Sequence, residues 1–211
     1  MDVTHAVLLA AGESTRMGAL KGLLPWEGRP LVVYQVEQLL ACAVERLVVV
    51  LGHRAAELRP HLAAAPRLVV VENVDYRTGK VSSILSGLAA LPPEGHVLIL
   101  SVDQPRPSWL LRACIESHTR GGAPITVAAY QGRRGHPVLF SPSLRSELAA
   151  IEEATQGLRA VLQRHREAVS VCETGSPLAL LNLNTPEDYA AARQVAGSQP
   201  PEPGVSSAPE A

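Results

Sequence analysis

Aromatic residues and net charge are both scarce in this chain of 211 residues. Phe, Trp and Tyr together make up 3% of the sequence, which argues against the stacking platforms that bind single-stranded nucleic acid. The formal net charge is −1, so the chain has no overall basic field that would attract a polyanion. We therefore expect no nucleic acid among its partners.

The chain has only three cysteines, Cys42, Cys114 and Cys172, and they lie far apart in the sequence. They form no C-x-x-C pair and no spacing typical of a zinc site. No apolar run is long enough to span a bilayer, and the segment Met1–His5 lacks the charged start and apolar stretch of a signal peptide. These absences predict reduced, mostly buried thiols in a cytoplasmic protein with no membrane partner.

The composition is that of a folded domain with a polar end. Hydrophobic residues make up 46% of the chain and charged residues 18%, which is typical of a globular protein with a sizeable core. We expect one domain over residues 1–196. Residues 197–211 are rich in Pro, Ser and Ala and cannot bury a core, so they predict a disordered tail.

Short apolar runs alternate with segments whose apolar residues recur at helical spacing. The expected strands are Ala6–Ala11, Leu47–Leu51, Leu68–Val71, Val97–Val102, Ile125–Ala129, Pro137–Phe140 and Val169–Cys172. The expected helices are Leu31–Ala43, Ala55–Ala64, Val81–Leu91, Ser108–His118, Leu158–His165 and Pro186–Val195. This alternation predicts an α/β fold of three layers, with a mostly parallel sheet covered by helices on both faces. Strand candidates that lie close together around Gly132–Gly135 predict a small antiparallel addition.

Ligands of an open α/β sheet bind at the loops that follow the carboxyl ends of its strands. Three loops should therefore converge: residues 12–21, the loop after Leu51 and the loop after Val102.

The first of these loops has the composition of a phosphate site. Gly12 and Gly18 permit backbone angles that other residues resist, and amides exposed in such a loop can bind an anion. Arg16 and Lys21 add two cations suited to phosphates. The loop is not a Walker loop, because Gly22 follows Lys21, and it lacks the third glycine of a dinucleotide fingerprint.

A single carboxylate, Asp103, comes directly after the apolar run Val97–Val102. Burying a carboxylate costs free energy unless a cation or hydrogen-bond donors compensate. An aspartate that only binds turn amides is one explanation. Together with the phosphate loop, a ligand of Mg²⁺ is the better one.

A polar segment, Glu72–Ser83, follows another apolar run. Asn73 offers a donor and an acceptor suited to a base edge or a ribose, and Gly79 permits close backbone approach. Ser82 or Ser83 could cap a helix whose amino end favours an anion. Plain helix capping without a ligand explains the serines equally well.

Two further segments carry polar groups. Arg133, Arg134 and His136 precede a strand and suit a phosphate-bearing acceptor, although a hairpin turn with solvated arginines is the alternative. Farther on, Asn182 and Asn184 alternate, so they should share one face. Thr185 and Pro186 then form a good helix start.

The motifs resemble those of the MobA-like nucleotidyltransferases, in particular the molybdenum cofactor cytidylyltransferase branch. The pattern L-A-A-G-x-S-x-R-M-G-x-x-K spans residues 9–21, and residues 73–83 and 132–137 resemble the segments N-x-x-x-x-x-G-x-x-x-S and G-x-R-G-H-P. Asp103 stands where the family's G-D-x-P motif holds a metal. Residues 182–187 read N-x-N-T-P-E, which is closer to the guanylyltransferase branch than to the D-x-D-T-P-E of the cytidylyltransferases.

The resemblance runs from about Val3 to Val195 and implies the fold of the nucleotide-diphospho-sugar transferases, which is Rossmann-like. It implies transfer of a nucleoside monophosphate from CTP to a molybdopterin-type acceptor, with release of pyrophosphate, Mg²⁺ as cofactor and a molybdoenzyme as client. The implied catalytic residues are Arg16, Lys21 and Asp103. The implied nucleotide-binding residues are Leu9, Ala10, Ala11, Gly12, Arg16, Lys21, Asn73, Gly79, Ser82 and Ser83. The implied acceptor-binding residues are Arg133, Arg134 and His136, and the implied metal ligands are Asp103 and Asn184.

Three alternatives remain open at this point. The first is guanine as the base, because the asparagines at 182 and 184 depart from the cytidylyltransferase pattern. The second is a sugar phosphate or an alcohol phosphate as the acceptor. The third is a non-catalytic chaperone that delivers a cofactor and releases no pyrophosphate.

Overall fold

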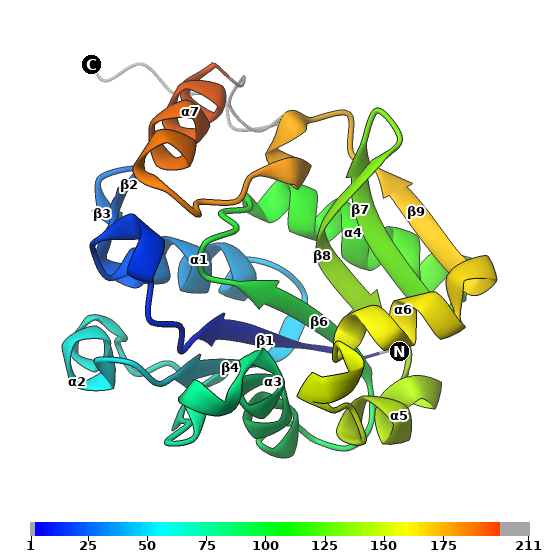
Figure 1. Ribbon diagram of the computed structural model, residues 1–211. Helices are drawn as coiled ribbons and strands as arrows, with labels where there is room; N and C mark the ends of the chain where they lie inside the picture. The colour runs from blue at the N-terminus through cyan, green and yellow to red at the C-terminus, as the bar shows by residue number, and fades with distance from the viewer. Residues whose placement is uncertain (1–2, 199–211) are drawn as a thin grey trace.

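The apolar runs of the sequence form the strands of one twisted sheet, shown in the computed structural model of Figure 1. The structure describes residues 3–198, so the expected tail lies outside the described residues except for its first two positions. The sheet has seven strands in the order β5-β4-β1-β6-β8-β7-β9. Their bounds are β1 Thr4–Ala10, β4 Val44–Leu51, β5 Leu68–Glu72, β6 His96–Ser101, β7 Ile125–Tyr130, β8 Arg133–Phe140 and β9 Val169–Glu173.

One strand of the seven runs against the others. β1 pairs in parallel with both β4 and β6, while β8 pairs antiparallel with its neighbours β6 and β7. The amino end of β8 therefore reaches the same edge of the sheet as the carboxyl ends of β1 and β6. This reversal delivers the segment Arg133–His136 to the edge where parallel strands present their ligand-binding loops.

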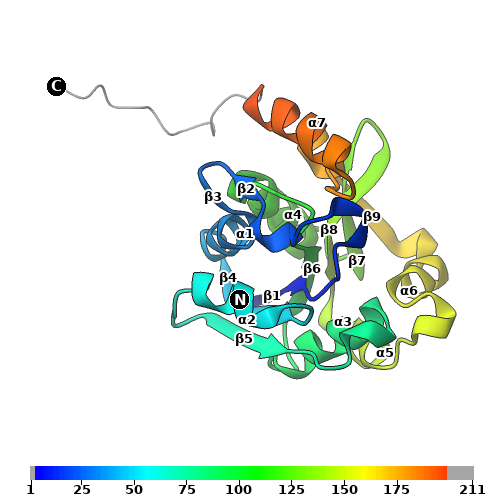
Figure 2. The ribbon, with the colours of Figure 1, turned by 60° about the vertical axis from the view of Figure 1, so that its left-hand side comes forward.

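Helices cover both faces of the sheet, as the two views in Figures 1 and 2 show. Their bounds are α1 Leu31–Leu40, α2 Ala55–Leu58, α3 Lys80–Ala89, α4 Ser108–Gly121, α5 Arg145–Ala149, α6 Leu158–Arg164 and α7 Pro186–Gly197. Short 3-10 helices span Thr15–Met17, Lys21–Leu23, Arg59–His61, Tyr76–Thr78, Pro142–Leu144, Glu153–Thr155, Arg166–Ala168 and Pro177–Leu180. The predicted three-layer α/β fold is confirmed.

Alternation along β1 divides the core into two clusters. Leu8 packs with residues of α1 and α4 on one face, whereas Val7 and Leu9 pack with α3, α5 and α6 on the other. All three side chains are 6% exposed or less. Successive side chains of a strand point to opposite faces, so a central strand between two helix layers must be apolar throughout.

Some expected elements differ from those observed. The helix expected over Ala55–Ala64 ends at Leu58 and continues only as a 3-10 turn, because Pro60 has no amide hydrogen to donate. The predicted antiparallel pairing around Gly132–Gly135 is confirmed: its strands are β7 and β8, which belong to the main sheet and meet at Gln131–Gly132. A two-stranded sheet that the sequence did not predict joins β2 (Pro25–Trp26) to β3 (Arg29–Pro30).

Two other expectations can be compared with the fold. The three cysteines are buried and free of disulfide bonds, as predicted. Across residues 3–198, no helix is both long enough and apolar enough to cross a membrane.

Helix α3 lies close against the sheet at Gly87, and this contact generates a stability prediction. A Cβ atom at Gly87 would lie 2.5 Å from Cγ1 of Val7 and 3.0 Å from Cγ2 of Val50, both in stiff, buried side chains. Overpacking of this kind costs about 1–3 kcal/mol. Gly87→Ala should therefore lower the free energy of unfolding by that amount in urea denaturation.

Gly121→Ala is the matched control, because Gly121 is also helical and a Cβ there meets nothing within 4 Å. Its stability should be unchanged or raised, since alanine favours a helix over glycine. Equal stability of Gly87→Ala and the wild type would show that α3 does not seat this closely on β1.

Candidate active site

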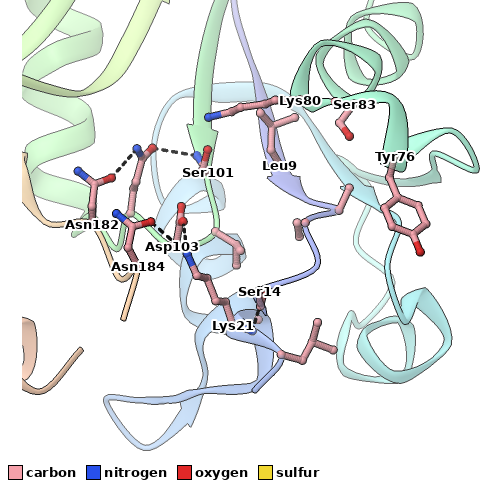
Figure 3. Close-up of a pocket in the computed structure, with 18 residues that line it drawn as sticks. Leu9, Ser14, Lys21, Tyr76, Lys80, Ser83, Ser101, Asp103, Asn182 and Asn184 are labelled. Atoms are coloured by element: carbon pink, nitrogen blue, oxygen red, sulfur yellow. Dashed lines mark hydrogen bonds and ion pairs between the residues drawn. The ribbon is translucent and has the colours of Figure 1, made fainter. Parts of the chain in front are cut away.

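A pocket of about 420 Å³ opens at the edge of the sheet where β1 and β6 end (Figure 3). It lies beside α3 and the loop that follows β1. The lining residues are Leu9, Ala10, Ala11, Gly12, Ser14, Leu20, Lys21, Gly22, Tyr76, Gly79, Lys80, Ser83, Ser101, Val102, Asp103, Gln104, Asn182 and Asn184. This is the position at which open α/β sheets bind their ligands.

The loop after β1 turns back on itself through left-handed backbone at Ser14 (φ 57°) and Gly18 (φ 68°). The amide of Lys21 donates to Oγ of Ser14 across 3.2 Å, which closes the loop and fixes the start of the Lys21 side chain. Gly18 therefore needs the freedom that the sequence predicted. Gly12 does not: its φ is not left-handed, and a Cβ there would meet open space.

The centre of the pocket is a contact between this loop and the end of β6. Nζ of Lys21 lies 2.7 Å from Oδ2 of Asp103, and it also donates to Oδ1 of Asn184 across 3.3 Å. The side chains of Lys21 and Asp103 are 12% and 22% exposed. Three segments far apart in the sequence thus converge on one charged point, which lies within the pocket rather than in the interior.

Arg16 lies at the margin of this cluster. Its Nη2 atom lies 3.5 Å from Oδ1 of Asn184, and the residue is exposed and does not line the pocket. The structure therefore places both predicted cations of the loop beside the same amide oxygen.

The segment 181–184 contributes its side chains without belonging to a strand of the sheet. Leu183 is buried and its amide donates to the carbonyl of Asp103 across 2.8 Å. Asn182 and Asn184 on either side both line the pocket, so the predicted alternation holds. Thr185 then caps α7 in a reciprocal capping box with Asp188, as the sequence indicated for this helix start.

A fully buried arginine, Arg106, which the sequence analysis missed, connects the segments on the side of the pocket that carries Asp103 and Asn182. Arg106 donates to the carbonyls of Pro105, His136, Ala179 and Leu181 at 2.8–2.9 Å. Burial lowers the pKa of Arg106 to about 9. The guanidinium links the loop after β6, the amino end of β8 and the segment that leads to Asn182.

Two buried glutamines support the same loop. Gln35 of α1 donates to the carbonyl of Gln104 across 2.7 Å and accepts from the amide of Arg106 across 3.2 Å. Gln104 accepts from the amide of Ser101 and donates to Oδ1 of Asn182 across 2.8 Å. These contacts pin the backbone on both sides of Asp103.

The segment after β5 reaches the pocket only in part. Gly79 and Ser83 line it, whereas Asn73 and Ser82 do not. Asn73 is 4% exposed, and its amide nitrogen donates to the hydroxyls of Ser82 and Ser83. Its oxygen accepts from the amide of Asp75, so its polar atoms serve the loop and do not face the pocket.

Helix α3 begins earlier than expected, and its serines do not cap it. The helix starts at Lys80 after Gly79, whose φ of 130° favours glycine. Ser82 lies in the first turn and donates to the carbonyl of Gly79. The amide of Val81 donates instead to Oε2 of Glu153 across 2.8 Å, so a distant carboxylate occupies the amino end of the helix.

The loop after Leu51 was expected to converge with the other two, and it contacts the loop after β1 but does not line the pocket. Gly52 packs behind the loop after β1, where a Cβ would lie 2.8 Å from Cβ of Ala11 and of Tyr76. The amide of His53 donates to the carbonyl of Ala11. This loop supports the pocket wall from outside.

A second cavity of about 650 Å³ lies between α3, α6 and the sheet strands β7 and β8. It is lined by Lys80, Val81, Ile84, Val127, Arg134, Gly135, His136, Val138, Glu153, Gln156, Gly157, Leu158, Arg159 and Leu162. Arg134 and His136 of the predicted acceptor site line it, whereas Arg133 is exposed and does not. Lys80 lines both cavities, and the sequence analysis did not single it out.

Burial, together with the positive charges of Arg106 and Lys80, lowers the pKa of His136 to about 4. The imidazole is therefore neutral near pH 7 and presents a polar, uncharged group to the second cavity.

The residues present fit a divalent metal ion. Oδ2 of Asp103 and Oδ1 of Asn184 both point at one positive charge, the Lys21 ammonium, which marks a position where a cation meets two oxygen donors. Among the described residues, no three His, Cys, Asp or Glu side chains cluster to form a complete metal site. Mg²⁺ suits such an open set, because it is usually held by one or two protein oxygens plus substrate phosphates and water.

The comparisons with known proteins agree with this geometry. Residues 6–169 match the MobA-like NTP transferase domain. Nicotine blue oxidoreductase of Paenarthrobacter nicotinovorans is 36% identical over 75% of this chain and 80% of that protein. Molybdenum cofactor guanylyltransferase of Ectopseudomonas mendocina is 32% identical over 91% of this chain and 96% of that protein. Molybdenum cofactor cytidylyltransferase of Escherichia coli K12 is 26% identical over 92% and 97%.

The fold has a solved counterpart of the same extent. The crystal structure of Rv0371c from Mycobacterium tuberculosis H37Rv in complex with manganese has a TM-score of 0.74 and 25% identity, covering 92% of this chain and 99% of that one. The domain match spans most of the described chain. It includes the loop after β1, Asp103 and the strands β6, β7 and β8. The chain therefore belongs to the MobA-like NTP transferase family of nucleotidyltransferases.

Proposed function

We propose that this protein transfers a nucleoside monophosphate, with CTP as the preferred donor, to a phosphate group of a molybdopterin-type acceptor and releases pyrophosphate. The observation that carries the proposal is the contact between Lys21 and Asp103 within the pocket. It sets a phosphate-binding cation and a metal-binding carboxylate at one point, which is the pairing that nucleotidyl transfer requires.

The chemistry needs no protein nucleophile. An oxygen of the acceptor phosphate attacks the α-phosphorus in line, the bond from the α-phosphorus to the pyrophosphate oxygen breaks, and pyrophosphate leaves with the electron pair. Lys21 and Arg16 lie where they can bind the departing pyrophosphate, since both reach the oxygen of Asn184. The protein contributes position and charge, which are the main terms in phosphoryl-type transfer.

Asp103 and Asn184 are the residues that would hold Mg²⁺ in this proposal. The ion supplies Lewis-acid stabilisation of charge on the phosphate oxygens when it is bound. Lys21 holds both oxygens in the free protein, so its ammonium moves to the phosphates when a nucleotide is bound.

The second cavity is the proposed acceptor site. Its walls are apolar at Ile84, Val127 and Leu162, which suits a planar ring system. Arg134 and the neutral His136 supply polar contacts. The G-x-R-G-H-P segment favours cytosine, and the N-x-N-T-P-E segment favours guanine as the alternative base.

A second candidate function rests on a specific comparison, the relative named nicotine blue oxidoreductase at 36% identity. Two cavities that share Lys80 also give room for a dinucleotide beside a planar heterocycle. On this alternative the protein would catalyse an oxidation or a reduction and release no pyrophosphate.

One screen separates these functions. The purified protein is incubated with Mg²⁺, each of the four nucleoside triphosphates and molybdenum cofactor, a sugar phosphate or an alcohol phosphate, and pyrophosphate release is measured. The proposal predicts release with CTP and the molybdenum cofactor. Release with GTP would identify guanine as the base, and release with a sugar phosphate or an alcohol phosphate would identify that compound as the acceptor. Oxidation of a reduced nicotinamide without pyrophosphate would establish the oxidoreductase alternative, and cofactor binding without either reaction would establish a delivery chaperone.

Asp103→Ala should abolish transfer and leave the fold intact. Within residues 3–198, Asp103 is the one carboxylate that forms an ion pair with Lys21, and its side chain is not part of the hydrophobic core. Pyrophosphate release should fall by at least about a hundredfold, as for the loss of one central electrostatic group. Glu116→Ala, which removes an exposed carboxylate on α4, should keep the wild-type rate. Near-normal Mg²⁺-dependent turnover of Asp103→Ala would exclude the metal role.

Lys21→Ala should weaken binding of the nucleoside triphosphate. The ammonium is the innermost cation of the loop, and each charge-assisted hydrogen bond to a phosphate contributes about 1.5–3 kcal/mol. We expect the dissociation constant of magnesium CTP, measured by calorimetry, to rise by about tenfold or more. An unchanged dissociation constant would contradict a role of Lys21 at the phosphates.

A further inference from the structure

The chain has only two lysines among its 19 basic residues, and both line the same pocket. The other 17 are arginines. One lysine, Lys21, comes from the loop after β1. The other, Lys80, is the first residue of α3, on the opposite side of the pocket, and in Figure 3 its side chain extends toward the end of β6.

Lys80 is the residue that the two cavities have in common. Every other residue that lines one of them is absent from the lining of the other. Its side chain therefore stands at the junction between the proposed nucleotide site and the proposed acceptor site.

The ammonium of Lys80 is the uncommitted cation of this junction. Among the described residues it makes no hydrogen bond or ion pair, whereas Lys21 is held by Asp103 and Arg106 by four carbonyls. Partial burial in the pocket wall lowers the pKa of Lys80, the charge of Asp103 opposes that shift, and Arg159 and Lys21 add to it. A cation kept in such a place without a partner is available to a ligand that brings negative charge.

The transfer reaction brings two anions together at this junction. The acceptor phosphate must approach the α-phosphate of the nucleotide to roughly 3–3.5 Å between the reacting atoms. The repulsion between them is strong in a partly buried site, where charges are poorly screened. An ammonium with three rotatable donors suits this task better than a rigid guanidinium, because the phosphate geometry changes as the bond moves.

We propose that Lys80 is a catalytic residue that binds non-bridging oxygens of the α-phosphate and of the acceptor phosphate at once. The inference rests on the proposed function and names a group that this function does not otherwise use. Lys80 stays protonated throughout. The new bond joins the acceptor oxygen to the α-phosphorus, and pyrophosphate carries away the electron pair of the broken bond.

The first experiment detects the contact without relying on turnover. Protein labelled with ¹³C at the ε carbon of lysine gives two signals, which Lys21→Met and Lys80→Met assign. Magnesium CTP followed by inorganic phosphate, as a probe of the acceptor group, should shift the Lys80 signal at each addition. A Lys80 signal that neither addition moves would overturn the proposal, whether or not the protein releases pyrophosphate.

The second experiment separates catalysis from binding. Lys80→Met should lower kcat for pyrophosphate release by about 10²–10³, in line with the loss of one electrostatic group at developing charge. Its dissociation constant for magnesium CTP should rise by only about tenfold, the loss expected for one hydrogen bond to a phosphate, so the fall in kcat should exceed the loss of binding. Lys80→Arg restores the charge and should recover much of the rate, which a purely structural role would not explain.

The outcomes distinguish this proposal from the proposed function. Wild-type protein that releases no pyrophosphate with any donor and acceptor defeats the proposed function, and the lysine signals then decide the role of Lys80 alone. An active wild type with an equally active Lys80→Met defeats the role of Lys80 and leaves the proposed function standing. Lys80 belongs to neither hydrophobic core cluster, so the thermal stability of Lys80→Met should match that of the wild type.

Discussion

The contact between Lys21 and Asp103 is the interaction on which the rest of the site depends. It joins the loop after β1 to the end of β6, two segments 82 residues apart in the sequence, across 2.7 Å. Each partner compensates the desolvation of the other within the pocket, where neither is fully exposed. On the proposed function, both groups are also the ones that a nucleotide and its metal ion would use, so ligand binding would have to separate them.

The sheet makes this contact possible, and one reversed strand completes it. β1 and β6 are parallel neighbours, so their carboxyl ends bring Lys21 and Asp103 to the same edge. β8 runs the other way and brings its amino end, with His136, to that edge as well. Arg106 connects the loop after β6, the amino end of β8 and the segment before Asn182 through their main-chain carbonyls. These hydrogen bonds fix the backbone and do not use the side chains of Lys21 and Asp103.

The sequence predicted what is local and missed what depends on distant packing. Apolar runs, the loop composition and a carboxylate after a strand led directly to β1, β6, Lys21 and Asp103. Arg106 lies between two prolines and resembles a surface loop, and only its four carbonyl partners explain why it is buried. Asn73 has the chemistry of a ligand-binding residue, yet the turn uses its polar atoms. The place of Lys80 in the pocket depends on where α3 begins. Glu153 helps to set that start, because it accepts a hydrogen bond from the amide of Val81, 72 residues earlier in the sequence.

A double-mutant cycle on turnover tests directly whether Lys21 and Asp103 form one catalytic unit. The measurement compares kcat for pyrophosphate release in the wild type, Lys21→Met, Asp103→Asn and the double variant. Groups that act as a unit show strongly non-additive losses. The account predicts a double variant about as slow as the slower single variant. Losses that multiply would show two independent groups and contradict it.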